Sequence, residues 1–131
     1  MQCVFCTLAA EHEKHLFDGR HCYAVLDINP ASRGHMLVIT DEHYETLLEV
    51  PDDVVAELFI VAKALGAKAV ERLGASGLNI GTNIGRIAGQ EIMHTHVHII
   101  PRYTNSWPHG RKRLSDAEGG ELFNLLKIDS I

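Results

Sequence analysis

The sequence contains a cluster of potentially reactive side chains: three histidines, His94, His96 and His98, separated by single residues. The intervening Thr95 and Val97, like the two isoleucines that follow, favour a β-strand. Side chains two residues apart on a strand project from one face at intervals of about 6.6 Å. Burying three imidazoles together brings no structural gain, so the run indicates a functional site.

Three clustered imidazoles suit two kinds of chemistry. They can hold a metal ion, or a neutral imidazole can attack phosphorus while a protonated neighbour stabilises the phosphate oxygens. Imidazole titrates near neutral pH, so neighbouring rings can divide these tasks. The spacing alone leaves both chemistries open.

Hydrophobic periodicity predicts the elements that position these histidines. Alternating residues predict strands, and a period near 3.6 predicts helices. The predicted strands are 21–27, 35–40, 77–83 and 90–102, and the predicted helices are 51–73 and 117–126. Pro30 and Gly34 lie between the first two strands, which we expect to form a hairpin.

The segment 51–73 carries the strongest helical signal. Pro51, Asp52 and Asp53 suit a first turn, and Gly74 suits the position after the last one. The apolar stripe at helical spacing consists of Val55, Leu58, Phe59, Ala62, Leu65, Ala69, Val70 and Leu73. Such a stripe needs a sheet to cover it.

Composition sets the broad class. The chain has 131 residues, 46% of them hydrophobic, which favours one domain over residues 1–131. A net charge of −5 argues against a long nucleic acid as partner. No apolar stretch is long enough for a membrane span or a secretory signal, so we expect a soluble, cytoplasmic protein. The basic run 111–113 is interpreted as solvated surface, with an anionic ligand as the alternative.

The histidine run resembles the signature of the histidine-triad (HIT) family: His94-x-His96-x-His98 followed by two apolar residues. The resemblance extends to Ala88-Gly89-Gln90, to Asn83, and to the segments 26–30 and 34–39, and covers about residues 3 to 102. It implies an α+β fold with a five-stranded antiparallel sheet, one long helix and short terminal helices. It also implies a homodimer and a purine nucleotide substrate of the AMP type.

The same resemblance implies a covalent nucleotidyl-histidine intermediate formed without an obligatory catalytic metal. His96, the middle histidine, would attack the α-phosphorus, and water would then release the mononucleotide. His98 would donate a hydrogen bond to the phosphate, and a backbone carbonyl would fix the tautomer of His96. His94 and His35 complete the set of catalytic candidates. His35 has an alternative role as a core histidine bonded to the backbone.

The resemblance also implies a set of nucleotide contacts. Asp27 is similar to the acid that accepts both ribose hydroxyls, although it could also cap a turn. Asn83, Gly89, Gln90 and Glu91 resemble the phosphate-contact segment. Ile28 adjoins the ribose acid, and the apolar slot for the base consists of Val4, Phe5, Leu8, Val25 and Leu37, all of which also suit ordinary core positions.

Two features bear on the leaving group and point in opposite directions. Many relatives carry Ser or Thr where this chain has Glu91, and a carboxylate there repels a polyphosphate and favours an amine. Pro101-Arg102, however, is common in relatives that act on diadenosine polyphosphates. Phosphoramidates and dinucleoside polyphosphates therefore both remain candidate substrates.

Cys3, Cys6, His43 and His94 resemble the ligands of zinc-bearing members of the family. Two thiolates and two imidazoles suit tetrahedral zinc, which would be structural because protein fills all four positions. The alternatives are that Cys3 and Cys6 are small core residues or a redox pair. Cys22 is predicted to be an ordinary core residue.

The sequence thus predicts a nucleotide hydrolase or nucleotidyl transferase. A nucleotide-binding sensor or partner-binding module that keeps the pocket without turnover is the second hypothesis. A zinc-organised interaction domain with an inactive site is the third.

Overall fold

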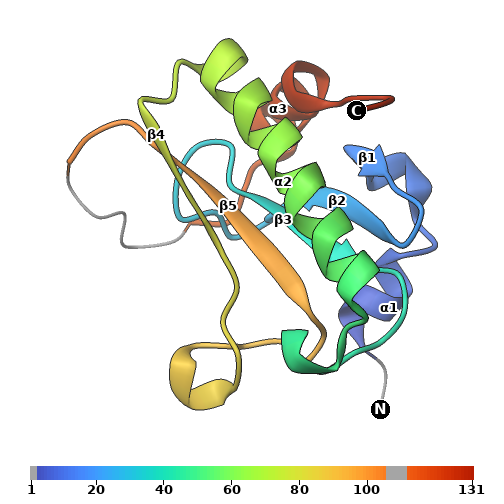
Figure 1. Ribbon diagram of the computed structural model, residues 1–131. Helices are drawn as coiled ribbons and strands as arrows, with labels where there is room; N and C mark the ends of the chain where they lie inside the picture. Colours follow the sequence, from blue (N-terminus) through green and yellow to red (C-terminus); the bar gives the residue numbers. More distant parts are fainter. Residues whose placement is uncertain (1–2, 106–111) are drawn as a thin grey trace.

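The computed structural model describes residues 3–105 and 112–131 (Figure 1). A five-stranded antiparallel sheet has the order β1-β2-β3-β5-β4. Its strands are β1 (Phe17–Asp18), β2 (Cys22–Leu26), β3 (Met36–Thr40), β4 (Gly77–Gly81) and β5 (His96–Arg102). The α-helices are α1 (Val4–Leu8), α2 (Asp52–Leu73) and α3 (Asp116–Leu126), and the 3-10 turns are η1 (His12–Lys14), η2 (Leu47–Glu49) and η3 (Arg86–Ala88). The predicted α+β fold is confirmed.

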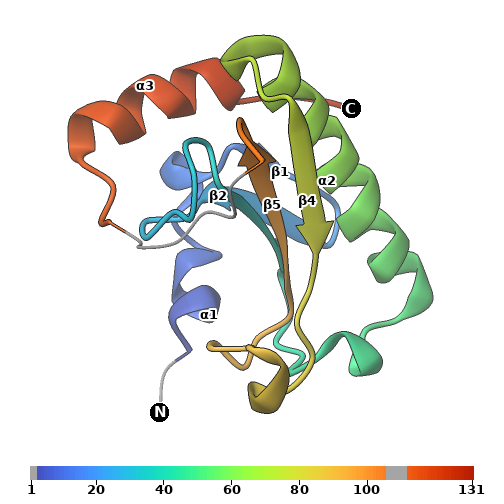
Figure 2. The ribbon, with the colours of Figure 1, turned by 90° about the vertical axis from the view of Figure 1, so that its left-hand side faces the viewer.

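The two faces of the sheet have different covers. Figure 2 shows α2 along one face and α1 against the other. Side chains alternate accordingly: Ala24 and Val38 pack under α2, whereas Val25 and Leu37 belong to the cluster beside α1. On β5, Val97 lies on the α2 side, so strand alternation places His96 and His98 on the α1 side.

The hairpin of β2 and β3 sets what lies next to the histidines. Leu37 pairs with His98 and Ile39 pairs with His96 across the ladder between β3 and β5. Val25 pairs with Leu37 one strand further along. An apolar floor therefore adjoins the two imidazoles.

The predicted boundaries of two strands need correction. The strand expected over 90–102 begins at His96, and the one expected over 77–83 ends at Gly81. Before β5 the backbone amides bond locally or to another loop: the amide of His94 donates to the carbonyl of Ile92, and that of Thr95 donates to Tyr44. His94 therefore lies outside the strand that carries the other two histidines.

Helix α2 begins one residue after the predicted start, with Pro51 as its N-cap, and ends where predicted, with Gly74 in the left-handed conformation at φ 72°. Its buried face, however, is rotated from the predicted stripe. Phe59 and Val70 are exposed, whereas Val61 and Gly66 are buried. A Cβ on Gly66 would lie 2.8 Å from the terminal methyl of Leu78 on β4, so glycine allows a close approach of helix and sheet with this leucine rotamer. Within the described residues, no helix is long and apolar enough to cross a membrane.

Candidate active site and metal cluster

His96 presents one ring nitrogen for chemistry. Its Nδ1 lies 2.7 Å from the backbone carbonyl of His94, to which it donates a hydrogen bond. This contact leaves Nε2 as the basic nitrogen of the neutral ring. Burial lowers the pKa of His96, although the His94 carbonyl and the charges of Asp27 and Glu91 oppose this shift. A neutral imidazole beside a cleft is the form that a nucleophile requires.

His35 and His98 form a directed chain of hydrogen bonds, which we call the relay. The amide of Ala31 donates to Nδ1 of His35 at 2.9 Å, so the proton of His35 lies on Nε2. That nitrogen lies 3.0 Å from Nδ1 of His98, to which it donates. The proton of a neutral His98 is thereby kept on its own Nε2, the nitrogen remote from His35. The arrangement prepares His98 as a donor.

Asp27 lies between this relay and the neighbouring turn. Its Oδ2 is 3.6 Å from Nε2 of His35, and its Oδ1 accepts a hydrogen bond from the amide of Asn29 at 2.8 Å. The turn-capping role considered for Asp27 is therefore present. Its side chain is 12% exposed and also lines the cleft, so capping and ligand contact are compatible.

A cleft of about 700 Å³ opens beside His96 and His98. Ten of the eleven residues expected to contact the nucleotide line it: Val4, Phe5, Leu8, Val25, Asp27, Ile28, Leu37, Asn83, Gly89 and Glu91. Phe5, Val25 and Leu37 are buried as well, so they serve the core and the cleft together. The cleft thus combines an apolar wall with a polar end at the imidazoles.

Gln90 is the exception. Its Nε2 donates to the carbonyls of Glu45 and Ile92, at 2.6 and 3.1 Å, and its Oε1 accepts from the amide of Gly85 at 2.8 Å. Because these backbone groups engage both ends of the amide, Gln90 braces the loop and does not line the cleft. Of the segment expected to contact the phosphate, the side chain of Gln90 is thus not part of the cleft lining.

Residues near the C-terminus form a wall of the cleft that was not predicted from the sequence. Leu114, Ser115, Gly119 and Phe123 line it, and the amide of Leu114 donates to the carbonyl of Ile28 at 2.8 Å. Ser115 accepts a hydrogen bond from the amide of Glu118 and caps α3. The Ser-x-x-Glu spacing was a readable start signal for this helix, but nothing in it indicated a packing partner.

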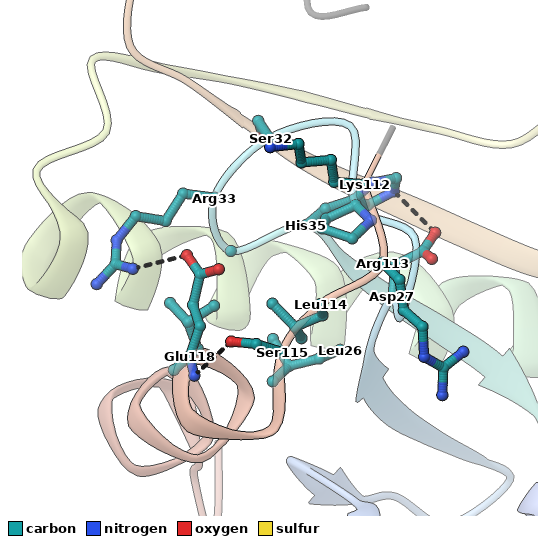
Figure 3. Close-up of a pocket in the computed structure, with 13 residues that line it drawn as sticks. Leu26, Asp27, Ser32, Arg33, His35, Lys112, Arg113, Leu114, Ser115 and Glu118 are labelled. Carbon is teal, nitrogen blue, oxygen red and sulfur yellow. Dashed lines mark hydrogen bonds and ion pairs between the residues drawn. The ribbon is translucent and has the colours of Figure 1, made fainter. Parts of the chain in front are cut away.

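A smaller hollow of about 430 Å³ lies behind the relay. Figure 3 shows His35 and Asp27 on one side of it and the ion pair between Arg33 and Glu118 on the other. Arg113 lines this hollow and the main cleft, so part of the predicted basic run borders the site. Arg111 of that run lies outside the described residues.

His94 points away from the cleft into a cluster of side chains that could hold a metal ion. Its Nδ1 lies 3.3 Å from Sγ of Cys3, 3.5 Å from Sγ of Cys6 and 3.2 Å from Nδ1 of His43. The ligand atoms of all four residues lie within 4.8 Å of one another. His94 thus serves the site through its carbonyl oxygen, and its assignment as a catalytic side chain is corrected.

The three histidines consequently do not converge on one metal ion. Among the described residues, no group of potential metal ligands contains all three. The physical reason is the late start of β5, which sends the side chain of His94 toward α1 and leaves His96 and His98 at the cleft. Of the two chemistries that the spacing allowed, the three-imidazole metal site is thereby removed.

The cysteine cluster fits a tetrahedral zinc ion by its chemistry. Nε2 of His94 lies 2.7 Å from the carbonyl of Thr40, to which it donates, and Nδ1 is therefore the nitrogen available to a metal. Burial lowers the pKa of His94, which favours the neutral, ligating form. The donor set of two thiols and two imidazoles is the one that structural zinc takes.

Comparison with known proteins decides the family. Residues 10–105 match the family model of the HIT domain. The chain is 43% identical over 103 residues to an uncharacterised HIT-like protein of Methanocaldococcus jannaschii, covering 77% of this chain and 79% of that one. The chain belongs to the HIT family.

Other HIT relatives add names and structures. The adenylylsulfatase HINT3 of Arabidopsis thaliana is 40% identical over 76% of this chain, which spans 52% of that protein. The crystal structure of a hypothetical histidine triad nucleotide-binding protein from Sulfolobus tokodaii superposes with a TM-score of 0.85 at 35% identity, over 95% of this chain and 89% of that one. A zinc-bound histidine triad family protein from Mycobacterium smegmatis gives 0.82 at 32% identity, over 96% and 94%. The zinc-bound relative agrees with the cysteine cluster of this HIT protein.

Proposed function

We propose that this HIT protein is a nucleotide hydrolase or nucleotidyl transferase that cleaves at the α-phosphate of adenosine-type nucleotides. The observation that carries the proposal is the geometry of His96. Its Nδ1 is engaged by the His94 carbonyl, its Nε2 is basic, and the ring lines a cleft large enough for a nucleotide.

The reaction then proceeds in two displacements. In the first, Nε2 of His96 forms a bond to the α-phosphorus while the bond from phosphorus to the leaving group breaks with its electron pair. In the second, water attacks phosphorus, the bond to His96 breaks, and the nucleoside monophosphate leaves. His98, oriented by His35, donates its Nε2 proton toward a phosphate oxygen as negative charge develops there.

The remaining walls suit the rest of the nucleotide. Val4, Phe5 and Leu8 of the α1 region face Val25 and Leu37 of the sheet and supply an apolar slot for the base. Asp27 offers carboxylate oxygens to the ribose hydroxyls, with Ile28 beside it. Asn83 and Gly89 border the same cleft. At φ 98° a Cβ on Gly89 would lie 3.2 Å from Asn83, so glycine leaves this space open.

The leaving group is the least constrained part of the substrate. Glu91 is exposed at the cleft, where its charge disfavours a polyphosphate and favours a phosphoramidate. Arg102 donates to Asn79 at 2.7 Å across β4 and β5, so this structure gives it a role outside the cleft. The balance supports a phosphoramidate over a dinucleoside polyphosphate. The named activity of HINT3 adds adenylylsulfate as a third substrate to assay.

Two assembly features complete the proposal. Structural zinc in the cysteine cluster would connect α1 to the loop before β5, and its reduced thiols suit a cytoplasmic location. A homodimer is supported by β4, which ends the sheet order and carries the half-exposed Ile80. Sedimentation of the protein and of Ile80→Lys measures this association directly.

Turnover in ¹⁸O-labelled water tests the proposed activity. Adenosine phosphoramidate, diadenosine tetraphosphate and adenylylsulfate are each incubated with the protein, and we expect AMP that carries one ¹⁸O atom on phosphorus. The variant Glu91→Ser should shift relative kcat/KM toward the tetraphosphate. Binding of AMP without turnover of any of the three would contradict the proposal and favour a nucleotide sensor.

A further inference from the structure

A second group of metal-binding side chains lies at the junction of η1 and β1, outside the cysteine cluster. It consists of His12, His15 and Asp18, whose ligand atoms lie within 4.8 Å of one another. Nδ1 of His12 is 3.1 Å and Nδ1 of His15 is 2.5 Å from the same oxygen of Asp18, Oδ1. The side chains of His12 and Asp18 are 70% and 49% exposed, so an ion can enter from solvent.

His15 has its orientation fixed from behind. Its side chain is fully buried, and its ring stacks on Tyr23 with the centroids 4.4 Å apart and the planes 16° from parallel. Nε2 lies 2.9 Å from the carbonyl of Leu8, to which it donates. A ring held by one N–H to a backbone carbonyl has its other nitrogen directed at a ligand, as is common for metal-binding histidines.

We propose that His12, His15 and Asp18 form a second binding site for a divalent transition metal such as Zn²⁺, Co²⁺ or Ni²⁺. Two imidazole nitrogens and one carboxylate oxygen make a three-ligand set that leaves coordination positions open to water. This site is separate from the cysteine cluster, where four protein ligands are available. The proposal does not depend on the proposed nucleotidyl chemistry.

One of the two contacts already has the length that such an ion requires. Ligand atoms about 2.1 Å from a metal, at angles between octahedral and tetrahedral, lie roughly 3.0–3.4 Å apart. The contact between His12 and Asp18 already has this length, and the one between His15 and Asp18 needs to widen as the ion replaces the proton between them.

The site also touches the cleft. The carbonyl of Leu8, which accepts the hydrogen bond from His15, belongs to a residue that lines the cleft. Tyr23, stacked on His15, donates from its hydroxyl to the carbonyl of Phe5, which is buried on α1. A metal ion on His15 would thus hold the proton of the ring on Nε2 and fix this end of α1.

The zinc content of the protein, compared with that of matched variants, tests the proposal. The protein is equilibrated at pH 7.5 with a small excess of Zn²⁺, desalted and assayed by elemental mass spectrometry. We expect His12→Gln and Asp18→Asn each to hold one equivalent less than the parent, whatever the cysteine cluster contains. His21→Gln, at an exposed histidine outside the cluster, should match the parent.

NMR spectroscopy of the histidine ring nitrogens distinguishes metal binding from a simple ion pair. In the ¹⁵N-labelled protein, Zn²⁺ should shift Nδ1 of His12 and His15 while Nε2 of His15 keeps its proton. Equal metal content in the parent, His12→Gln and Asp18→Asn, with both Nδ1 signals unmoved by zinc, would overturn the proposal and leave a protonated histidine–aspartate pair. His12 is exposed, so its variant is expected to fold.

Discussion

His94 and His96 are separated by a single residue, yet their rings face different sites. Each ring donates one N–H to a backbone carbonyl: His94 uses Nε2 toward Thr40, and His96 uses Nδ1 toward His94. The remaining nitrogen is therefore Nδ1 in the cysteine cluster and Nε2 at the cleft. The comparison shows that carbonyl placement, more than residue type, assigns the chemistry of each imidazole.

The two sites share one wall. The ring of Phe5 contacts His94 and His96 edge-on, with centroid distances of 5.8 and 5.1 Å. One site is filled by sulfur and nitrogen donors, whereas the other opens into the cleft. If the cysteine cluster is structural and the cleft is catalytic, changes at the cluster should alter stability, and changes to His35 or His98 should alter turnover.

Removal of zinc should produce the largest change in stability. A bound ion at a free concentration about 1,000 times its Kd stabilises the folded state by about 4 kcal/mol. We expect chelation to lower the free energy of unfolding of the parent by an amount of this order. Cys6→Ser should lose most of this zinc dependence, because Cys6 is exposed and contributes little without a metal, and any residual effect of zinc would come from His12, His15 and Asp18. Urea unfolding with and without zinc measures both. If the free energy of unfolding of the parent did not change with zinc, the structural role of the cysteine cluster would be contradicted.

Loss of the relay should reduce turnover while zinc is retained. The shorter side chain of His35→Asn can still accept from the amide of Ala31 but does not reach His98, so we expect kcat to fall on the order of 100-fold. His35→Gln places an amide donor nearer to the position of Nε2 and should recover part of the loss. Single-turnover rates at saturating substrate measure both variants. Equal rates in the two variants would argue against an oriented proton.

A smaller effect is expected at Thr40, which bonds His94 from behind the cluster. Its hydroxyl lies 3.1 Å from Nε2 of His94, and its carbonyl accepts from the same nitrogen. Thr40→Val removes the hydroxyl contact with His94 and the hydrogen bond that the hydroxyl donates to the carbonyl of Glu42 at 2.7 Å, and it should weaken zinc affinity by roughly tenfold. Thr40→Ser should retain the affinity, and both variants should turn over as the parent does. Competition with a chromophoric chelator measures the affinity.

Part of the site followed from local sequence periodicity. Alternation along β5 predicts that His96 and His98 share one face, but it wrongly places His94 with them. The apolar slot for the base came from the family resemblance. The family resemblance supplied the relay partner His35 and the four residues of the cysteine cluster. These are positions that alternation alone does not relate to one another.

The remaining features depend on tertiary contacts that no local pattern encodes. The start of β5 is set by amides that bond to Tyr44 and Ile92, and this start sends His94 away from His96. Gln90 braces three loop segments whose proximity is not visible in sequence. The C-terminal wall required knowing that Leu114 bonds to Ile28. The pairing of His12 with Asp18 depends on the turn between η1 and β1.

The most direct test of the account is to trap the nucleotide on the protein. The parent and His96→Ala are mixed in single turnover with adenosine phosphoramidate labelled at the α-phosphorus, quenched, and analysed by peptide mass spectrometry. We expect an adenylyl adduct on His96 in the parent and none in the variant, with equal zinc content in both. Turnover without an adduct on His96, or an adduct on His94, would contradict the assignment of the two imidazoles.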